Sequence, residues 1–265
     1  AVLSMEPIVN QAAKWHYMYG GSSTAPLTIR MIIGRGWGQG PQHSQSLQAW
    51  FAHVPGLKVV MPTTPADAKG LLIAAVLDPA PVIVLEHRWL YDMVGLVEKE
   101  LIPATIGESK VVRAGQDVTL VGSSYMTLEC LRAADILADH GIQAEVIDLR
   151  TISPLDFATI KESVDRTGRL VVIDSGHIAF GITAEILART VESGVVLKSP
   201  PVRLGLPHAP TPTTAALADG YYPRAIDVLS AVARQLGLGS NPAWLTDPDV
   251  DSPHDQPNRN FTGPY

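Results

Sequence analysis

Residues 27–53 read L-T-I-R-M-I-I-G-R-G-W-G-Q-G-P-Q-H-S-Q-S-L-Q-A-W-F-A-H, and this stretch decides the fold. Its first part, residues 27–33, is a continuous run rich in β-branched side chains, which is typical of a strand buried on both faces of a parallel sheet. Its last part, residues 47–53, is predicted to be a helix. A strand, a glycine-rich loop and a helix in this order predict one unit of an open α/β sheet, in which ligands bind beyond the carboxyl ends of the strands.

The loop of residues 34–46 has glycine at every second position from 34 to 40, then proline, then Q-H-S-Q-S. The glycines allow positive φ values and a close approach of the backbone to a ligand. A flexible loop that presents the imidazole of His43 among amide and hydroxyl groups is typical of a catalytic site, although a surface connection with an incidental histidine has the same pattern. The glycines do not match the G-x-G-x-x-G dinucleotide spacing, and the chain contains no G-x-x-x-x-G-K-[ST] phosphate loop.

The composition argues against several classes of protein. The 265 residues are 46% hydrophobic with a net charge of −6, and scattered Lys and Arg argue against a nucleic-acid surface. No apolar run approaches the ~20 residues needed to span a bilayer. The single cysteine, Cys130, rules out an internal disulfide and fits a reducing compartment. We therefore expect a cytoplasmic protein in which Cys130 packs in the core.

Strands and helices alternate twice along the chain, which predicts an α/β fold of two doubly wound units with mainly parallel sheets. The first alternation occupies residues 1–92. Residues 93–116 have no strong period and contain proline and glycine, so we place a linker there. The second alternation occupies residues 117–238. Within it, S-P-L-D at 153–156 predicts the start of a helix with Ser153 as N-cap.

Residues 239–265 are rich in Pro, Asp and Asn and show no periodicity, which on its own is typical of a disordered tail. Three aromatic residues are nevertheless spaced along it, namely Trp244, Phe261 and Tyr265. We therefore expect an extended tail whose aromatic side chains are buried against this chain or a partner.

Five stretches, in the order and spacing in which they occur, are similar to one known family. They are I-V-N-Q-A-A-K at 8–14, the strand and loop at 27–46, P-G-L-K-V-V-M-P-T-T-P-A-D-A-K-G at 55–70, D-L-R-T-I-S-P at 148–154 and Y-Y-P at 221–223. Over residues 5–236 the chain resembles the beta subunit of thiamine-diphosphate-dependent 2-oxoacid dehydrogenases. The resemblance implies that residues 1–92 are the C-terminal part of a pyrimidine-binding domain and that residues 117–238 are a transketolase C-terminal-type domain.

The same resemblance implies that the chain works with an alpha subunit in an α2β2 heterotetramer. In this family the alpha subunit supplies the G-D-G motif that holds Mg²⁺ and the diphosphate of the cofactor, and this sequence has no G-D-G. The implied reaction is oxidative decarboxylation of pyruvate or a branched-chain 2-oxoacid, with transfer of the acyl group to the lipoyl arm of an acyltransferase component. From the composition we expect no nucleic-acid partner and no membrane partner.

His43 matches the active-site histidine of the family, and an imidazole with a pKa near ~6.5 suits proton transfer to and from a reacting substrate. Gln42, Ser44 and Gln45 flank it and would orient it or line the cofactor pocket. The family also has a glutamate at N1′ of the aminopyrimidine and an aromatic residue near the cofactor, and both match positions upstream of Ala1. We therefore expect the sequence to be a truncation, a cleavage product or the second piece of a split chain.

A monovalent-cation site for K⁺, built largely from main-chain carbonyls, is also implied by the resemblance. The matching positions are Ala25, Leu27, Thr28, Ala75, Asp78 and Ala80. Positions 75 and 80 carry alanine where the family has Cys or Asn, a change that main-chain ligands tolerate. The alternative is an ordinary strand end beside the end of a helix.

Two other functions are compatible with the sequence. A split transketolase-like enzyme half would share the fold and the cofactor, but it should carry basic residues for sugar phosphates, and only isolated arginines are present. A non-catalytic, truncated assembly subunit would only dock a partner. Four further residues are weaker candidates: His177 and His208 suit a turn or an interface as well as a site, and the pair that follows the third strand could face a subunit interface, namely Glu86 and His87.

Overall fold

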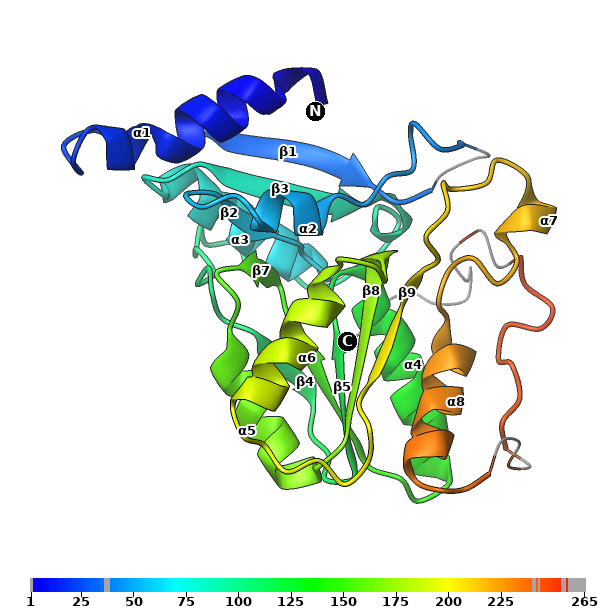
Figure 1. Ribbon diagram of the computed structural model, residues 1–265. Helices are drawn as coiled ribbons and strands as arrows, with labels where there is room; N and C mark the ends of the chain where they lie inside the picture. Colours follow the sequence, from blue (N-terminus) through cyan, green and yellow to red (C-terminus); the bar gives the residue numbers. More distant parts are fainter. Residues whose placement is uncertain (1, 36–38, 240–241, 243, 254–255, 257–265) are drawn as a thin grey trace.

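The computed structural model describes residues 2–35, 39–239, 242, 244–253 and 256, and within these ranges two β-sheets lie one above the other (Figure 1). The upper sheet has the spatial order β1 (Thr28–Ile33), β3 (Val82–His87), β2 (Lys58–Val60) and β7 (Thr151–Ser153). β1, β3 and β2 are parallel, and β7 is antiparallel to β2. The upper sheet is therefore completed by a strand from the second half of the chain.

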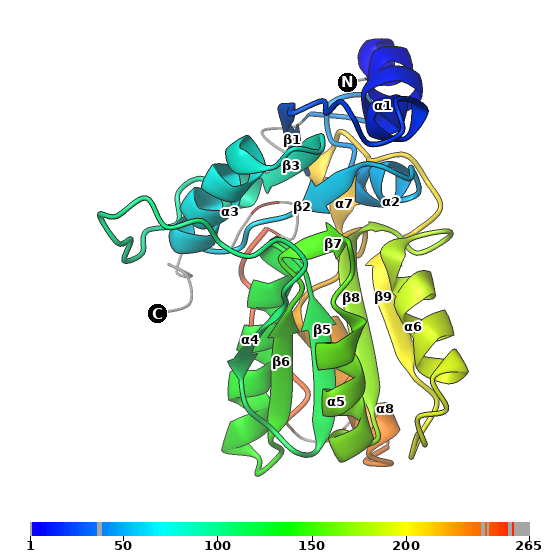
Figure 2. The same cartoon turned by 90° about the vertical axis from the view of Figure 1, so that its left-hand side faces the viewer.

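Helices cover both faces of the upper sheet. α3 (Pro65–Leu77) lies on one face and α2 (Gln48–Ala52) lies on the other (Figure 2). α3 starts at a capping box, in which the Thr64 hydroxyl accepts the Asp67 N–H at 3.0 Å. Beyond the β1 edge lies an N-terminal helical segment made of η1 (Val2–Ser4), the π-helical turn η2 (Pro7–Ala12) and α1 (Ala13–Met18).

The lower sheet has the spatial order β4 (Lys110–Arg113), β6 (Ala144–Asp148), β5 (Val118–Gly122), β8 (Leu170–His177) and β9 (Val202–Leu206). Its strands are parallel except β4, which is antiparallel to β6. One face is covered by α4 (Tyr125–Asp139) and α8 (Ala225–Gln235), and the other by α5 (Phe157–Thr167) and α6 (Ile182–Glu192) (Figures 1 and 2). Two short elements lie in connections, η3 (Arg88–Leu90) and α7 (Ala215–Ala218). The predicted α/β fold class is confirmed.

The two sheets share part of their hydrophobic core. One cluster joins Ile33 of β1 and Phe51 of α2 to Val121 and Ile147 of the lower sheet, each 3% exposed or less. A second cluster lies between the lower sheet and the pair α4 and α8, and it contains the buried thiol of Cys130, as predicted. Burying one such large apolar side chain is worth roughly 1.5–3 kcal/mol. The shared cluster therefore fixes the relative position of the two units and of the loops between them.

Three local expectations are wrong. β1 is an edge strand in which Ile32 is 51% exposed, so it is not buried on both faces. Ser153 does not cap a helix, because α5 begins at Phe157 with Asp156 as its N-cap, whose Oδ1 accepts the Thr159 N–H at 3.3 Å. Ser153 instead ends β7, where pairing with β2 satisfies the backbone. The predicted linker contains a strand, β4, which is too short for its alternation to be recognised in the sequence.

The tail after residue 239 returns along the lower unit (Figure 1). Trp244 is half-buried against the lower core, and its ring stacks on His140 with centroids 5.5 Å apart. The other two aromatic residues of the expected anchor set, Phe261 and Tyr265, lie outside the described residues. The burial of Trp244 shows that this part of the tail packs against its own chain.

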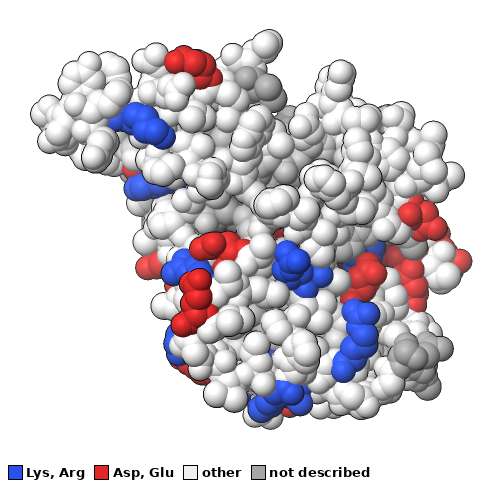
Figure 3. Space-filling view, viewed as in Figure 1, with Lys and Arg blue, Asp and Glu red and all other residues white. Residues whose placement is uncertain are grey.

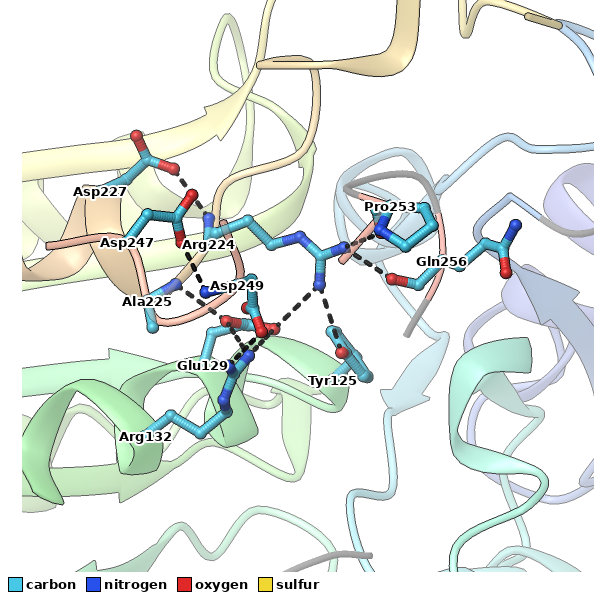
Figure 4. A network of polar contacts seen from close by, with 10 residues as sticks. All are labelled: Tyr125, Glu129, Arg132, Arg224, Ala225, Asp227, Asp247, Asp249, Pro253 and Gln256. Carbon is cyan, nitrogen blue, oxygen red and sulfur yellow. Dashed lines mark hydrogen bonds and ion pairs between the residues drawn. The ribbon is translucent and has the colours of Figure 1, made fainter. Parts of the chain in front are cut away.

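A buried ionic network fastens the next part of the tail to α4 and α8 (Figure 4). Glu129 is fully buried and is held by Arg132 at 3.2 Å and by Arg224 at 3.3 Å. Arg132 also pairs with Asp249 of the tail at 2.6 Å, and Arg224 donates to the main-chain carbonyl of Gln256 at 2.6 Å. Both arginines therefore join the tail to the same carboxylate of the lower unit.

Charge and apolar exposure are distributed differently over the surface. On the face seen in Figure 3, acidic and basic residues are interspersed over the lower unit and sparse on the upper one. Large exposed apolar side chains include Leu3, Tyr17, Trp50 and Phe180. Exposed apolar side chains such as these mark contacts with other proteins when they form a contiguous surface.

Within the described ranges, none of the helices has both the length and the apolar character needed to cross a bilayer.

Asp148, the last residue of β6, makes the stability of the fold depend on pH. Asp148 as a whole residue is 1% exposed. Its Oδ1 accepts from the Thr127 hydroxyl at 3.1 Å and from the Arg150 N–H at 3.3 Å. Burial raises the pKa of Asp148 to about 7, with a further rise from the charge of Asp67. The unfolded chain releases this proton near pH ~4, so folding becomes less favourable as the pH rises from about 4 to about 7.

We expect Asp148→Asn to become more stable than the wild type as the pH rises, because asparagine does not ionise. One pKa unit corresponds to about 1.4 kcal/mol, so the advantage of the variant should grow by on the order of 3 kcal/mol between pH 4.5 and pH 8. Urea unfolding of both proteins at the two pH values measures this difference. A pH-independent difference between them would show that Asp148 is ionised in the folded chain throughout this range.

Candidate functional site

The loop between β1 and α2 lies at the carboxyl edge of the upper sheet (Figure 1). Gly34 begins the loop with a φ of 80°, and a Cβ at this position would lie 2.6 Å from Nε2 of His87. Only glycine fits here, because the backbone is left-handed and the neighbouring ring leaves no room for a side chain. The next three residues of the glycine run, 36–38, lie outside the described residues.

His43 is exposed, and main-chain contacts fix the loop around it. Its N–H donates to the Gly40 carbonyl at 3.2 Å, and its carbonyl accepts from Arg88 Nη2 at 3.3 Å. Arg88 Nε donates to the Gly34 carbonyl at 3.0 Å, so one guanidinium joins the start of the loop to His43. Among the described residues, no group forms a hydrogen bond with the His43 ring. The backbone of His43 is therefore held while its imidazole is available to a ligand.

The other predicted site residues lie in the same turn, but they differ in availability. Gln42 and Gln45 are exposed, and Gln45 Nε2 donates to the Gln42 carbonyl at 3.3 Å. Ser44 is 2% exposed, and its hydroxyl donates to the Gln39 carbonyl at 2.9 Å. The Ser44 hydroxyl therefore shapes the turn, whereas both glutamine side chains are accessible from outside.

The lower unit holds the loop from the other side. Arg35 is 2% exposed, and its guanidinium donates to the carbonyls of Pro212 at 3.3 Å and Thr213 at 2.6 Å. A Cβ at Gly40 would overlap the Thr213 hydroxyl, so the loop and the connection after β9 are in direct contact. The described part of the loop is thus held between the two units instead of extending freely over the surface.

A pocket of about 340 Å³ opens between this loop and the lower unit. Pro41 and residues 44–46 border it on the loop side, and His177, Leu206 and residues 208–211 border it on the other side. His177 Nδ1 donates to the Pro207 carbonyl at 2.7 Å, which leaves Nε2 as an acceptor. The rings of His177 and His208 lie 6.3 Å apart. The structure therefore brings both weaker histidine candidates to a pocket that the His43 loop also lines.

His87, at the end of β3, lies in the core and not on the surface. Burial, together with the positive charges of Arg88 and Arg224, lowers the pKa of His87 to about 3. Its Nδ1 accepts the Trp89 N–H at 3.3 Å, and its ring stacks on Tyr125 with centroids 5.3 Å apart. His87 is therefore neutral at physiological pH and packs the junction between the two units.

The positions matched to a cation site lie around the amino ends of β1 and β3 and the end of α3, and they are Ala25, Leu27, Thr28, Ala75, Asp78 and Ala80. The Leu27 carbonyl accepts the Val82 N–H at 2.8 Å. The Asp78 carboxylate accepts the Ala80 N–H at 2.9 Å and pairs with the Lys58 ammonium at 2.5 Å. An ion here would depend on main-chain carbonyls, each of which has a second lone pair. In the described part of the chain, no group of three His, Cys, Asp or Glu side chains is placed to hold a metal ion.

Comparison with known proteins identifies both units. Residues 3–93 match the transketolase pyrimidine-binding domain, and residues 107–228 match the transketolase C-terminal domain. Among solved structures, a split-gene transketolase described as an inactive beta4 tetramer has the same fold, with a TM-score of 0.72 over 89% of this chain and 72% of that one at 24% identity. The fold and the two domains thus define a transketolase-type chain.

Proteins with similar sequences show which family of transketolase-type chains this one belongs to. The beta subunit of acetoin:2,6-dichlorophenolindophenol oxidoreductase from Cupriavidus necator is 43% identical over 89% of this chain and 70% of its own length. The Bos taurus mitochondrial pyruvate dehydrogenase E1 component subunit beta is 40% identical over 89% of this chain and 67% of its own length. The chain belongs to the family of E1 beta subunits of thiamine-diphosphate-dependent 2-oxoacid dehydrogenases, which are oxidoreductases. The predicted family and enzyme class are confirmed.

Sequence reasoning located the loop but missed the residues that hold it. Arg88 directly follows β3 and Arg35 lies two residues after the end of β1, and this position at a carboxyl edge was the available signal. A third anchor, Gln48, is the first residue of α2 and is fully buried, which the polar character of glutamine does not suggest. The role of His43 and its neighbours in the reaction stays a prediction.

Proposed function

We propose that the chain combines with an alpha subunit in an α2β2 heterotetramer that oxidatively decarboxylates pyruvate or a branched-chain 2-oxoacid. The acyl group would pass to the lipoyl arm of an acyltransferase component. The observation that carries this proposal is the available imidazole of His43 on a loop held by Arg88 and Arg35, in a chain of the E1 beta family.

In this proposal His43 exchanges a proton with the oxygen of the substrate carbonyl. Thiamine diphosphate, when bound, supplies the sink for the electrons left behind when carbon dioxide departs. The imidazole suits the protein's part because histidine is the side chain that most often acts as a general acid or base in enzymes. Fixing the backbone of His43 at both its N–H and its carbonyl limits the positions that the ring can take.

The residues present fit one side of a shared cofactor site. Gln42 and Gln45 offer neutral amide donors and acceptors, Ser44 supports the turn, and the described part of the chain offers no acidic cluster for a divalent ion. We therefore assign Mg²⁺ and the diphosphate to the alpha subunit, and contacts near the reacting end of the cofactor to residues 42–45. K⁺ would bind the main-chain carbonyls around Leu27.

The surface supports a partner chain. A groove of about 860 Å³ lies between α2 and α6, with Trp50 and Phe180 among the residues that line it. Phe180 is 95% exposed, and Leu3 and Tyr17 of the N-terminal helical segment are also exposed. Covering such apolar surface favours association.

We also propose that the chain divides into a pyrimidine-binding part at residues 1–92, a linker at 93–116, a C-terminal domain at 117–238 and a tail at 239–265. We propose a cytoplasmic location as well, and the single buried cysteine supports it.

Acetoin is the second candidate substrate. The two acetoin relatives are 43% and 39% identical to this chain, close to the 40% of the Bos taurus pyruvate relative. Cleavage of acetoin needs the same electron sink and the same proton exchange, so the loop serves both substrates equally well. Turnover with pyruvate, branched-chain 2-oxoacids and acetoin, measured side by side, distinguishes them.

The test of this function is reconstitution with the alpha subunit. We expect sedimentation to give the mass of an α2β2 complex and calorimetry to show thiamine diphosphate binding to the complex in the presence of Mg²⁺. Either chain alone should bind the cofactor far more weakly, because each contributes only part of the site. A complex that assembles but does not bind the cofactor would support the rival reading, a non-catalytic assembly subunit.

A further inference from the structure

A buried hydrogen bond joins the His43 loop to the lower sheet. Gln48, the first residue of α2, directly follows the loop and is 0% exposed. Its Nε2 donates to Oδ1 of Asp174 at 2.8 Å, and Asp174 is 1% exposed near the carboxyl end of β8. The two residues belong to different units of the fold. The bond therefore ties the end of the loop to a fixed strand of the other unit.

The surroundings of Asp174 make Gln48 its principal partner. Burial raises the pKa of Asp174 to about 6, and the hydrogen bond from Gln48 is the strongest of the contacts that oppose this rise. The others are neutral donors, namely the main-chain N–H groups of Ser175 and Gly176 and the Ser123 hydroxyl at 3.5 Å. A buried carboxyl group is costly unless its hydrogen bonds are made, so the position of the Gln48 amide is strongly constrained.

The pair occupies the space beside Gly176 that a side chain would fill. A Cβ at Gly176 would lie 2.7 Å from Asp174 Oδ2 and 2.8 Å from Gln48 Nε2, so the absence of a side chain at this position makes room for both groups. Within the described residues, Gln48 Oε1 is buried without a hydrogen-bond partner, which costs stability. The contact between Gln48 and Asp174 is therefore kept at a cost to the stability of the fold.

We propose that Gln48 and Asp174 are positioning residues for His43: their bond sets the place of the loop relative to the lower unit. This inference rests on the proposed role of His43. Arg88 fixes the loop to the upper sheet at His43 itself, whereas Gln48 fixes its exit to the lower unit. With both ends fixed, the turn that carries His43 keeps its place beside the pocket that residues 44–46 and His177 line.

The chain contains a matched control for this contact. Gln235 is also buried, its Nε2 donates to the Leu170 carbonyl at 3.0 Å at the opposite end of β8, and its Oε1 is also unpartnered among the described residues. Gln48→Leu removes a buried amide bond to the Asp174 carboxyl group of β8, and Gln235→Leu removes buried amide bonds to the main-chain carbonyls of Leu170 in β8 and of Pro200. Only the first of them touches the His43 loop.

The experiment compares these variants in the assembled enzyme. Since a misplacement of about 1 Å costs ~10²-fold in rate, we expect Gln48→Leu to lower kcat by about 10- to 100-fold with little change in KM. Gln48→Leu and Gln235→Leu should lower Tm by similar amounts. Gln235→Leu should leave kcat within about twofold of the wild type. Asp174→Asn should keep most activity, because its amide oxygen still accepts from Gln48, whereas Asp174→Leu should behave like Gln48→Leu.

Hydrogen exchange supplies a readout that needs no activity. The amides of residues 39–47 should exchange faster in Gln48→Leu than in Gln235→Leu. If the loop exchanges faster but the wild-type enzyme shows no turnover, the proposed function is wrong and the positioning contact stands. If Gln48→Leu matches Gln235→Leu in both kcat and loop exchange, the positioning role is overturned.

Discussion

Replacing His43 with alanine in the assembled enzyme should lower turnover by about 10²–10⁴-fold, the usual contribution of a positioned acid or base. The loss should fall on kcat more than on KM, because the imidazole acts mainly on charge that develops during the reaction. Folding and assembly should be unaffected. The ring is exposed and unbonded within the described residues, so its removal leaves neither a cavity nor an unpaired buried group.

A suitable control for this variant is His53→Ala. His53 is also exposed, but it lies at the far end of α2, away from the turn of residues 40–45. Steady-state kinetics with the matched 2-oxoacid and a lipoyl acceptor should show wild-type turnover for His53→Ala. Near-wild-type turnover in His43→Ala as well would mean that the assignment of the catalytic histidine is wrong.

Arg224→Leu should lower the free energy of unfolding by about 3 kcal/mol, because removing one partner of a buried ion pair leaves the other charge uncompensated. Arg224 is 3% exposed, Glu129 is fully buried, and the two are 3.3 Å apart. Arg132 still holds Glu129 in the variant, so the lower end of the usual range is expected. The bond to the Gln256 carbonyl is also lost, so the tail should become more accessible to proteases (Figure 4).

Urea unfolding measures this loss, and limited proteolysis reports on residues 244–256. The control is Arg30→Leu, which breaks a pair with Glu86 in which the arginine side chain is 58% exposed. An exposed pair of this kind contributes at most about 1 kcal/mol. Equal losses in Arg30→Leu and Arg224→Leu would show that the buried network is no more important to stability than a surface pair.

The strands and helices with strong local patterns could be predicted from the sequence. Continuous apolar runs such as residues 118–122 form strands buried on both faces, and the Thr64–Asp67 capping box starts α3 in the structure. Short elements escaped prediction because their pairing decides them. β4 and β7 are each too short to show alternation, and β7 joins the sheet of the other unit only through its contact with β2.

The candidate site could likewise be predicted only in part. The turn that carries His43 could be found because residue types and spacing are local properties of a sequence. Its supports could not, because Arg35 and Gln48 bind groups that lie 177 and 126 residues away along the chain. Such long-range partners depend on the folded arrangement of both units, so the sequence places Arg35 at the carboxyl edge of a strand but does not show which groups it binds.

The most direct test of the account is acyl transfer by a reconstituted complex. Purified alpha subunit, the full-length beta subunit, thiamine diphosphate, Mg²⁺ and a lipoyl-bearing acceptor are mixed, and acylation of the acceptor is followed with each component omitted in turn. We expect 2-oxoacid-dependent acylation that requires both chains and is lost with His43→Ala. An assembled, cofactor-loaded complex that acylates the acceptor no faster than the alpha subunit alone would contradict the proposed function.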